Sequence, residues 1–309
     1  ELFLPSKKWN KEYIFARNQG TGYSDNIHQE KCMAANGMGG WSGLCPTQEL
    51  VDAYEMANGS TPIIGYNADG TPIINGASGY SETGFAATAG KHYPAGVYNM
   101  YVGREPRFYA SINFNGQQWR GRQLEFWQGG KDGINVSKVD YCCTGYLLRK
   151  TADEGVDVIN GKGGMKEASI LFRVGSLYLD YAEALNEAEG PVDDVYKYVD
   201  AIRKRAGLPG LAKGLDKDKM RERIQHERQI ELAFEAGHRY FDCHRWKIAE
   251  KTDNGYMHGM NITATNKVDY SKRSTVGDSR VFEKKHYLFP IPQSEMDKQI
   301  GLVQSPYWE

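Results

Sequence analysis

The chain has 309 residues, of which 40% are hydrophobic and 12% aromatic, enough to bury the core of one large or two modest domains. Lys and Arg number 38 against 39 Asp and Glu, so the balanced charge excludes a strong field that would recruit nucleic acid or an anionic membrane. The mean hydropathy is −0.62, and no apolar run approaches the length of a membrane span.

The first half of the chain, residues 1–165, is rich in glycine and aromatic residues and short of long periodic segments. Its turn-forming dipeptides are Asn58-Gly59, Asp69-Gly70 and Asn75-Gly76. An irregular region of this length usually forms a binding surface or hides structure that sequence patterns do not reveal.

Few regular elements are predicted within this half. One helix is expected to begin at Pro46-Thr47 and to end before Gly59. Short strands are predicted over residues 107–114 and 145–150.

The second half, residues 166–309, reads as helical. A helix is predicted from Ile170, because apolar residues recur at helical spacing through Leu185. A second helix is predicted to begin at Pro191 and to stop at Gly207. Because the turn between them is short, the two helices must pack antiparallel. Their combined length is close to the tetratricopeptide period of about 34 residues. Because a lone unit of this kind cannot bury its apolar face, we expect partners elsewhere in a longer protein.

A third helix is predicted to end in a cluster of acids and bases over residues 227–246. His226-Glu227 begins like the helix of a zinc protease, but the residue four positions after His226 is Ile230, so the metal-binding pair is absent. We interpret the charges as a structural ion network rather than a catalytic centre, since buried charges must be paired. Its predicted members are Arg173, Glu183, Arg203, Glu227, Arg228, Glu231, Glu235, Arg239, Asp242 and Arg245.

The five cysteines lack metal-ligand spacing, and the adjacent Cys142 and Cys143 cannot readily bridge each other. We therefore predict free or core thiols, no metal and no other cofactor. The chain opens on Glu1-Leu2 without a basic and apolar signal sequence, so we expect that any targeting segment was removed or never included.

Several segments resemble a known family. Residues 170–187 (ILFRVGSLYLDYAEALNE), 200–208, 227–246 and 286–308 resemble signature segments of the SusD/RagB family in their order along the chain. The first half resembles the family at residues 46–54, 104–109 and 144–150. The chain looks like the C-terminal portion of a family member.

The resemblance implies a mainly α fold, with a tetratricopeptide-like helical scaffold, a large irregular loop-rich region and a few short strands. Residues 166–309 would supply the scaffold and residues 1–165 the glycan-facing region, packed together as one unit. It also implies non-catalytic binding of an oligosaccharide or polysaccharide at the cell surface and its delivery to a TonB-dependent, SusC-like outer-membrane transporter. The lipid anchor would lie in an N-terminal part not present in this chain.

Sugars present flat C–H faces and a rim of hydroxyls, which proteins meet with aromatic rings and polar side chains. The candidate glycan-binding residues in the loop-rich half are Trp127, Trp41, Tyr98, Tyr93, Tyr66, Asn99, Gln128 and Asp132. Trp127 is the first choice because the polar, glycine-rich segment 128–133 follows it. Trp119, Trp246 and Trp308 are assigned to packing.

Two other classes of function stay open at this stage. A helical-repeat adaptor for a protein partner would present a concave helical surface instead of an aromatic loop face. An α-helical carbohydrate-active enzyme would need two converging carboxylates, and no spacing in the sequence singles out such a pair.

Overall fold

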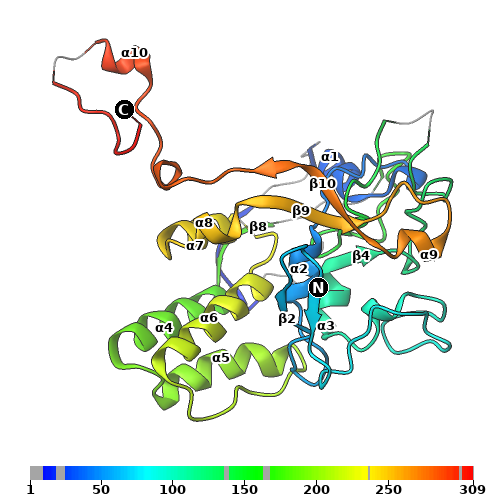
Figure 1. The fold of residues 1–309 in the computed structure, drawn as a ribbon, viewed down its shortest axis with the longest axis horizontal. Helices are drawn as coiled ribbons and strands as arrows, with labels where there is room; N and C mark the ends of the chain where they lie inside the picture. The colour runs from blue at the N-terminus through cyan, green and yellow to red at the C-terminus, as the bar shows by residue number, and fades with distance from the viewer. Residues whose placement is uncertain are drawn as a thin grey trace.

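The computed structural model describes residues 10–18, 25–135, 139–162, 168–235, 237–298 and 301–308. Three helices at the lower left of Figure 1 form a layer, and shorter helices, strand pairs and loops form the rest of the body. Among the described residues, no helix is long and apolar enough to cross a membrane. The fold is helical with short strands, and the longer helices all lie in the second half of the chain.

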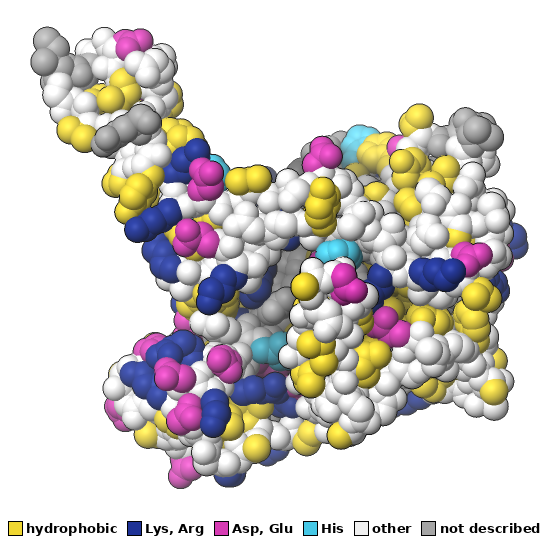
Figure 2. Space-filling model, in the orientation of Figure 1, with side chains coloured by type: hydrophobic (Ala, Val, Ile, Leu, Met, Phe, Trp, Pro, Cys, Tyr) yellow, Lys and Arg dark blue, Asp and Glu magenta, His cyan; other side chains and the backbone are white. Residues whose placement is uncertain are grey.

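The helical layer consists of α4 (Val174–Glu189), α5 (Asp193–Arg205) and α6 (Lys217–Glu231). Its shared apolar core contains Ala182, Val195, Tyr196, Val199, Leu211, Met220 and Ile224. Lys and Arg side chains intermingle with Asp and Glu over the outside of this layer (Figure 2). Part of the predicted apolar stripe of α4 remains uncovered, since Leu177 and Tyr181 are each 43% exposed.

The helix predicted from Ile170 begins four residues later than expected, at Val174. Residues 170–173 belong to strand β8 (Ala168–Arg173), which pairs antiparallel with β1 (Tyr13–Asn18). The apolar residues keep helical spacing from the strand into the helix, so the sequence predicts a single helix. The strand forms because it pairs with β1, about 150 residues earlier in the chain, and a local pattern contains no information about so distant a partner.

The charged cluster spans two helices rather than one. Helix α6 ends at Glu231, and α7 (His238–Arg245) begins after a break in which Phe234 adopts a left-handed φ of 63°. Helix α5 ends as predicted, with Gly207 at φ 81° immediately after its cap.

In the first half, the described helices are α1 (Asp25–Met33), α2 (Gln48–Ala53) and α3 (Pro106–Ser111), with 3-10 turns η1 (Asn36–Met38) and η2 (Asn99–Tyr101). Helix α2 confirms the predicted helix near its beginning, but it ends at Ala53 rather than just before Gly59. The predicted strand over residues 107–114 is wrong for its first part, because Pro106 occupies the first turn of α3 and favours helix there.

Apart from β1, the described strands of the first half pair antiparallel with one another, two by two. They are β2 (Ile63–Tyr66) with β3 (Pro72–Ile74), β4 (Ile112–Phe114) with β7 (Tyr146–Leu148), and β5 (Gln118–Trp119) with β6 (Arg122–Gln123). Strand β7 confirms the strand predicted within residues 145–150. The β2–β3 hairpin turns at Gly70, whose φ of 81° fits the predicted Asp-Gly turn.

The last part of the chain leaves the body as an arm (Figure 1). Before it come α8 (Ala249–Thr252), β9 (Gly255–Met260), α9 (Lys267–Tyr270) and β10 (Arg273–Arg280), with β9 and β10 paired antiparallel. The arm contains η3 (Lys284–Tyr287) and α10 (Gln293–Met296).

The main hydrophobic core joins the two halves of the chain. Tyr101, Phe108 and Tyr146 from the first half cluster with Ile230 and Tyr270 from the second. Burying these large side chains together supplies most of the apolar stabilisation of the body. The loop-rich half is therefore fixed on the same core as part of the helical half.

Candidate functional site

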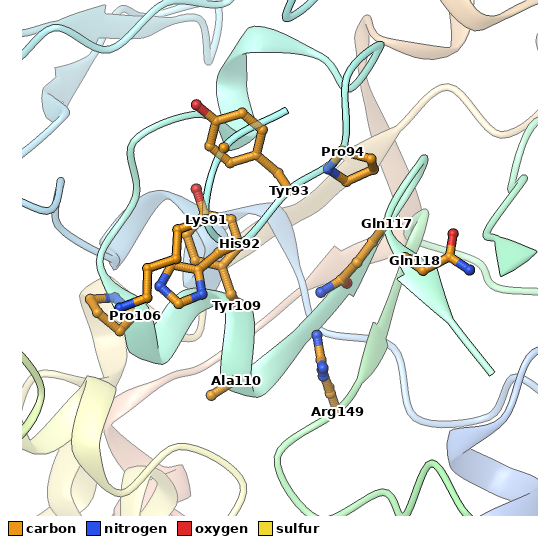
Figure 3. A pocket seen from close by; sticks show the side chains of 11 residues that line it. Lys91, His92, Tyr93, Pro94, Pro106, Tyr109, Ala110, Gln117, Gln118 and Arg149 are labelled. Atoms are coloured by element: carbon orange, nitrogen blue, oxygen red, sulfur yellow. The ribbon is translucent and has the colours of Figure 1, made fainter. Parts of the chain in front are cut away.

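A cavity of about 470 Å³ opens beside α3 in the loop-rich half. Its walls come from the segment at residues 90–94, helix α3, strand β5 and the residue that follows β7. The residues that line it are Gly90, Lys91, His92, Tyr93, Pro94, Pro106, Tyr109, Ala110, Gln117, Gln118 and Arg149 (Figure 3).

One wall of the cavity is aromatic. Tyr109 is buried and fixed by its hydroxyl, which donates to the carbonyl of Tyr101 at 2.6 Å and accepts from the backbone N–H of Arg104 at 3.2 Å. The rings of His92 and Tyr93 stack on Tyr109 with centroids 5.1 and 6.2 Å away. Burial raises the pKa of Tyr109 to about 12, so its phenol is neutral at physiological pH.

A glycine positions the Tyr93 ring. The backbone N–H of Gly90 donates to the carbonyl of Tyr93 at 2.9 Å, which closes a tight turn. The ring then lies against Gly90, where an added Cβ would come within 2.4 Å of the Tyr93 Cζ atom. A side chain at this position would therefore displace the ring.

The opposite wall is polar. Gln117 is only 2% exposed, and its Oε1 accepts from the backbone N–H of Phe114 at 3.3 Å. Arg149 lies over the ring of the buried Trp119 at 4.7 Å. Figure 3 shows the side chains of Gln117 and Arg149 directed toward one another, on the other side of the cavity from His92.

Tyr93 is the member of the predicted glycan-binding set that lines this cavity. Trp127 is half-buried at another place, with the Lys267 Nζ atom 5.2 Å above its ring, and the backbone N–H of Gln128 donates to the carbonyl of Ala264. Trp41 is 39% exposed and stacks on His28 at 5.6 Å.

The remaining aromatic candidates are tied to neighbouring polar groups. The Tyr66 hydroxyl donates to Asp52 at 2.7 Å, and the Tyr98 hydroxyl donates to the carbonyl of Glu82. The amide nitrogen of Asn99 donates to the carbonyl of Thr83 at 2.6 Å. The loop segment around residues 82–83 thus holds two of the candidates in place.

Asp132 is a correction to the predicted set. Its carboxylate is fully buried, accepts from both Arg122 Nη atoms at 2.6 Å and accepts from the backbone N–H of Glu125 at 2.9 Å. A carboxylate enclosed in this way stabilises the loop and is not presented to a ligand.

Most residues that line the cavity carry no signal in the sequence that predicts a site. Gln117, Gln118 and Arg149 come from separate segments that meet only in the folded chain. One signal was present at residues 91–93, where a cation, an imidazole and a phenol follow one another in a loop.

The charged residues of the second half form ion pairs in two groups. In the first, Glu231 accepts from Arg173 at 2.9 Å, and Glu227 accepts from Arg203 at 3.1 Å. Arg107 joins them by donating to Glu227 at 2.5 Å and Glu231 at 3.2 Å. Glu235 pairs with Arg173 at 2.7 Å.

The second group fixes α7 against α4. Arg228 pairs with Asp242 at 2.9 Å, and Arg245 pairs with Asp242 at 2.8 Å and with Glu183. The indole N–H of Trp246 also donates to Glu183 at 2.7 Å. Arg239, predicted as a further member, forms no ion pair with any residue that the structure describes.

The thiols and acids offer no metal centre in the described ranges. All five cysteines are free, as the sequence predicted. No group of three His, Cys, Asp or Glu side chains within the described residues is arranged to hold a metal ion.

Comparison with known proteins decides the family. The model of the SusD family matches residues 7–308, nearly the whole chain. The chain belongs to the SusD family.

Solved structures of SusD-like proteins share the fold. A SusD-like protein from Bacteroides fragilis is 30% identical, with a TM-score of 0.70, over 97% of this chain and 55% of that chain. Another from the same organism, described as a SusD-like carbohydrate-binding protein, is 24% identical with a TM-score of 0.67, over 93% of this chain and 53% of that chain.

Among curated proteins, the SusD-like protein P25 of Formosa agariphila is 42% identical over 82 residues, 26% of this chain and 15% of that protein. The SusD-like protein P2 of the same organism is 29% identical over 154 residues, 46% of this chain and 26% of that protein. This SusD-family chain spans about half the length of the solved relatives.

Proposed function

We propose that this chain is a non-catalytic glycan-binding protein of the bacterial cell surface, which captures an oligosaccharide or polysaccharide for a TonB-dependent outer-membrane transporter. Family membership supports glycan binding, and one relative of the same fold is described as carbohydrate-binding. The cavity beside α3 is the observation that carries the proposal for this chain.

The cavity has the properties that a sugar requires. Its volume of about 470 Å³ falls within the usual range for small-ligand sites, roughly 300–1,000 Å³. Tyr93 and His92 offer ring surface to a sugar's C–H face, while Gln118 and Arg149 offer groups for its hydroxyls. The site is preformed because Tyr109 and Gln117 are anchored in the core.

The predicted loop residues extend the proposal beyond the cavity. Trp127, Trp41, Tyr66 and Tyr98, with Asn99 and Gln128, are proposed contacts for further units of a polymer. Trp41 and Tyr66 have accessible ring surface, being 39% and 48% exposed.

Affinity gel electrophoresis and calorimetry with a panel of polysaccharides test the proposal. Tyr93→Ala is expected to weaken binding about threefold to tenfold, the usual contribution of one aromatic contact. Tyr256→Ala is the matched control, because Tyr256 is 54% exposed on β9 and lies outside the cavity. Equal binding by both variants and the parent would remove the cavity from the proposal.

The loop residues are tested separately with Trp127→Ala, Trp41→Ala and Tyr98→Ala. If all three bind glycan like the parent while remaining folded, the proposed loop contacts are wrong. Release of sugar products from a bound polymer would favour the enzyme alternative. A protein ligand on the helical surface, together with no glycan affinity, would favour the adaptor alternative.

We also propose the finer family features for the whole protein. Residues 166–309 would act as scaffold and residues 1–165 as the glycan-facing region, with α4 and α5 as one tetratricopeptide-like unit of a longer, lipid-anchored protein. The exposed Leu177 and Tyr181 on α4 support further helices there. Co-purification with the product of an adjacent transporter gene tests the partner, and absence of any such complex would count against it.

A further inference from the structure

Resting on the proposed glycan binding, we propose that the cavity beside α3 selects acidic sugars, with Arg149 as the ion partner of a carboxylate or sulfate ester. The shared chemistry is an oxyanion carried on a sugar ring that also contacts Tyr93. Three observations in the cavity support this assignment.

The first observation is the sign of the lining charge. Among the described residues that line the cavity, Lys91 and Arg149 are positively charged and none is Asp or Glu, while burial lowers the pKa of His92 and favours its neutral form. The chain as a whole has balanced charge, with 38 bases against 39 acids. The charge of the cavity wall is therefore more positive than that of the chain as a whole, and it favours binding of an anion.

The second observation is that Arg149 has no ion partner. Its side chain forms no ion pair or hydrogen bond with any described residue and rests on the Trp119 ring at 4.7 Å. Burial lowers the pKa of Arg149, and the charge of Glu154 opposes part of this shift. A guanidinium stays protonated in proteins, so a partly desolvated positive charge faces the cavity.

A neighbouring cavity provides the contrast. It shares Pro106 and Ala110 with the first cavity and contains Arg173 and Lys150. Those two cations are already satisfied by Glu235, at 2.7 Å from Arg173 and 2.5 Å from Lys150. The protein thus neutralises these two cations of the neighbouring cavity, whereas Arg149 has no ion partner among the described residues.

The third observation is a buried donor beside Arg149. Gln117 is 2% exposed, and its Nε2 has no hydrogen-bond partner within the described part of the chain. A buried amide N–H without an acceptor lowers the stability of the fold, and a ligand oxygen that accepts its hydrogen bond would recover that free energy. Gln117 and Arg149 both line the cavity, and their nitrogen-bearing ends are directed toward one another in Figure 3, so the proposal has one oxyanion accept from both.

These groups discriminate by charge. A neutral sugar offers Arg149 only uncharged hydroxyls and no opposite charge, so part of the desolvation cost of the guanidinium stays uncompensated. A planar carboxylate or a sulfate accepts from the guanidinium fork, and such charge-assisted hydrogen bonds are the strong ones. Specificity follows because the unpaired charge penalises the wrong ligand.

The test uses pairs of polymers that share a backbone and differ in charge. Polygalacturonate is compared with highly methyl-esterified homogalacturonan, and carrageenan with its desulfated form. Calorimetry on the 309-residue chain at low and high salt measures each affinity. We expect tighter binding of the charged member of one pair, and weakening by added salt because salt screens the ion pair. The preferred pair identifies the source of the oxyanion as carboxylate or sulfate.

Variants connect the preference to Arg149. Arg149→Gln is expected to reduce affinity for the charged polymer about tenfold to hundredfold and affinity for the neutral polymer by much less, so that the preference for charge is lost. Arg149→Lys should retain part of the preference, since it keeps the charge and loses the fork. Lys204→Gln is the matched control, because Lys204 is an exposed cation on α5 outside the cavity.

The outcomes separate the two proposals. Binding that ignores polymer charge, or an Arg149→Gln variant that keeps the preference, overturns the acidic-sugar assignment and leaves glycan binding standing. Binding of no polysaccharide by the folded parent chain overturns glycan binding itself. Circular dichroism and thermal unfolding confirm that each variant is folded before its affinity is compared.

Discussion

The absence of a side chain at Gly90 allows the Tyr93 ring to occupy its place in the aromatic wall of the cavity. An added Cβ would meet the Tyr93 ring at 2.4 Å, while the position has no left-handed φ that would by itself forbid a side chain. We expect Gly90→Ala to shift the ring and to weaken glycan binding about threefold to tenfold, as for loss of one aromatic contact.

The control for this prediction is Gly76→Ala. Gly76 has no atom within 4 Å of an added Cβ and no left-handed φ, so the same change should leave affinity unaltered. Calorimetry on both variants gives the comparison, and equal affinities would mean that the Tyr93 ring does not contact the glycan.

Glu231 is the most heavily paired carboxylate of the ion network. Burial alone would raise its pKa, but the charges of Arg173, Arg205, Arg107 and Lys150 lower the pKa of Glu231 to about 2. Glu231→Gln removes the carboxylate that Arg173, Arg107 and Arg205 share. Arg173 keeps Glu235 and Arg107 keeps Glu227, so we expect a loss of about 3 kcal/mol in unfolding free energy, at the low end for a broken buried pair. Glu187→Gln, at an exposed pair with Arg221, should cost less than about 1 kcal/mol.

The same carboxylate predicts how stability depends on pH. A folded-state pKa of about 2, below the usual 4.5, means that the unfolded chain binds more protons between these values. The contribution of Glu231 is complete above about pH 4.5 and is lost as pH falls toward 2. Urea unfolding across this range should show a shallower pH dependence in Glu231→Gln, and an identical slope would contradict the assigned ionisation.

Residue identity allowed part of the site to be foreseen. Tyr93 belonged to the predicted set because an exposed loop aromatic suits a sugar face, whereas Arg149 followed a strand and carried no local signal. Asp132 illustrates the opposite error, because a polar residue in a glycine-rich loop looks accessible although Arg122 encloses it. The residues next to Asp132 in the sequence do not show that its carboxylate pairs with Arg122 in the folded chain.

At the scale of elements, α5 and α7 end with the same hydrogen-bond pattern but different residues. After α5, the backbone N–H groups of Gly207 and Leu208 donate to Lys204 and Arg203. After α7, those of Lys247 and Ile248 donate to His244 and Cys243. This pattern requires a left-handed residue, which is Gly207 at φ 81° in one case and Lys247 at φ 57° in the other.

The strained end of α7 gives a prediction for stability. We expect Lys247→Gly to be about 1 kcal/mol more stable than Lys247→Ala, because glycine adopts positive φ without a side-chain clash. The alanine variant is the matched control, since both lose the Lys247 contact with the Tyr287 ring at 4.3 Å. Chemical denaturation of the two variants measures the difference, and a more stable alanine variant would refute the argument.

Element boundaries were predictable where the signal is local. Gly207 and Pro209 marked the end of α5, and the helix ends there. Residues 168–173 form a strand because they pair with β1. No pattern within residues 168–173 predicts that pairing. The break after α6 likewise depends on Phe234 packing against the core at an unfavourable φ.

On the scale of the whole molecule, the outer part of the C-terminal arm, beyond Leu288, forms its described hydrogen bonds within the arm itself. The indole N–H of Trp308 donates to the carbonyls of Lys285 and Leu288, and Ser305 donates to Phe289. Phe289 is 82% exposed, which shows that this part adds little to the body's core.

Deleting residues 289–309 should therefore change the unfolding temperature of the body by no more than about 2 °C, because the buried clusters remain complete. Differential scanning calorimetry of the shortened chain tests this. A large drop in the unfolding temperature would show that the arm packs onto the body in solution.

The core shared by the two halves also governs the order in which the chain can fold during synthesis. Its buried members run from Met33 to Tyr270, so the first half cannot complete its core until the ribosome has released residue 270. At synthesis rates of about 5–20 residues per second, residue 270 follows residue 165 by roughly 5–20 s. Helices α4, α5 and α6 are contiguous in sequence and can associate earlier. The loop-rich half, although made first, is expected to fold last and to depend most on chaperones while its aromatic side chains stay exposed.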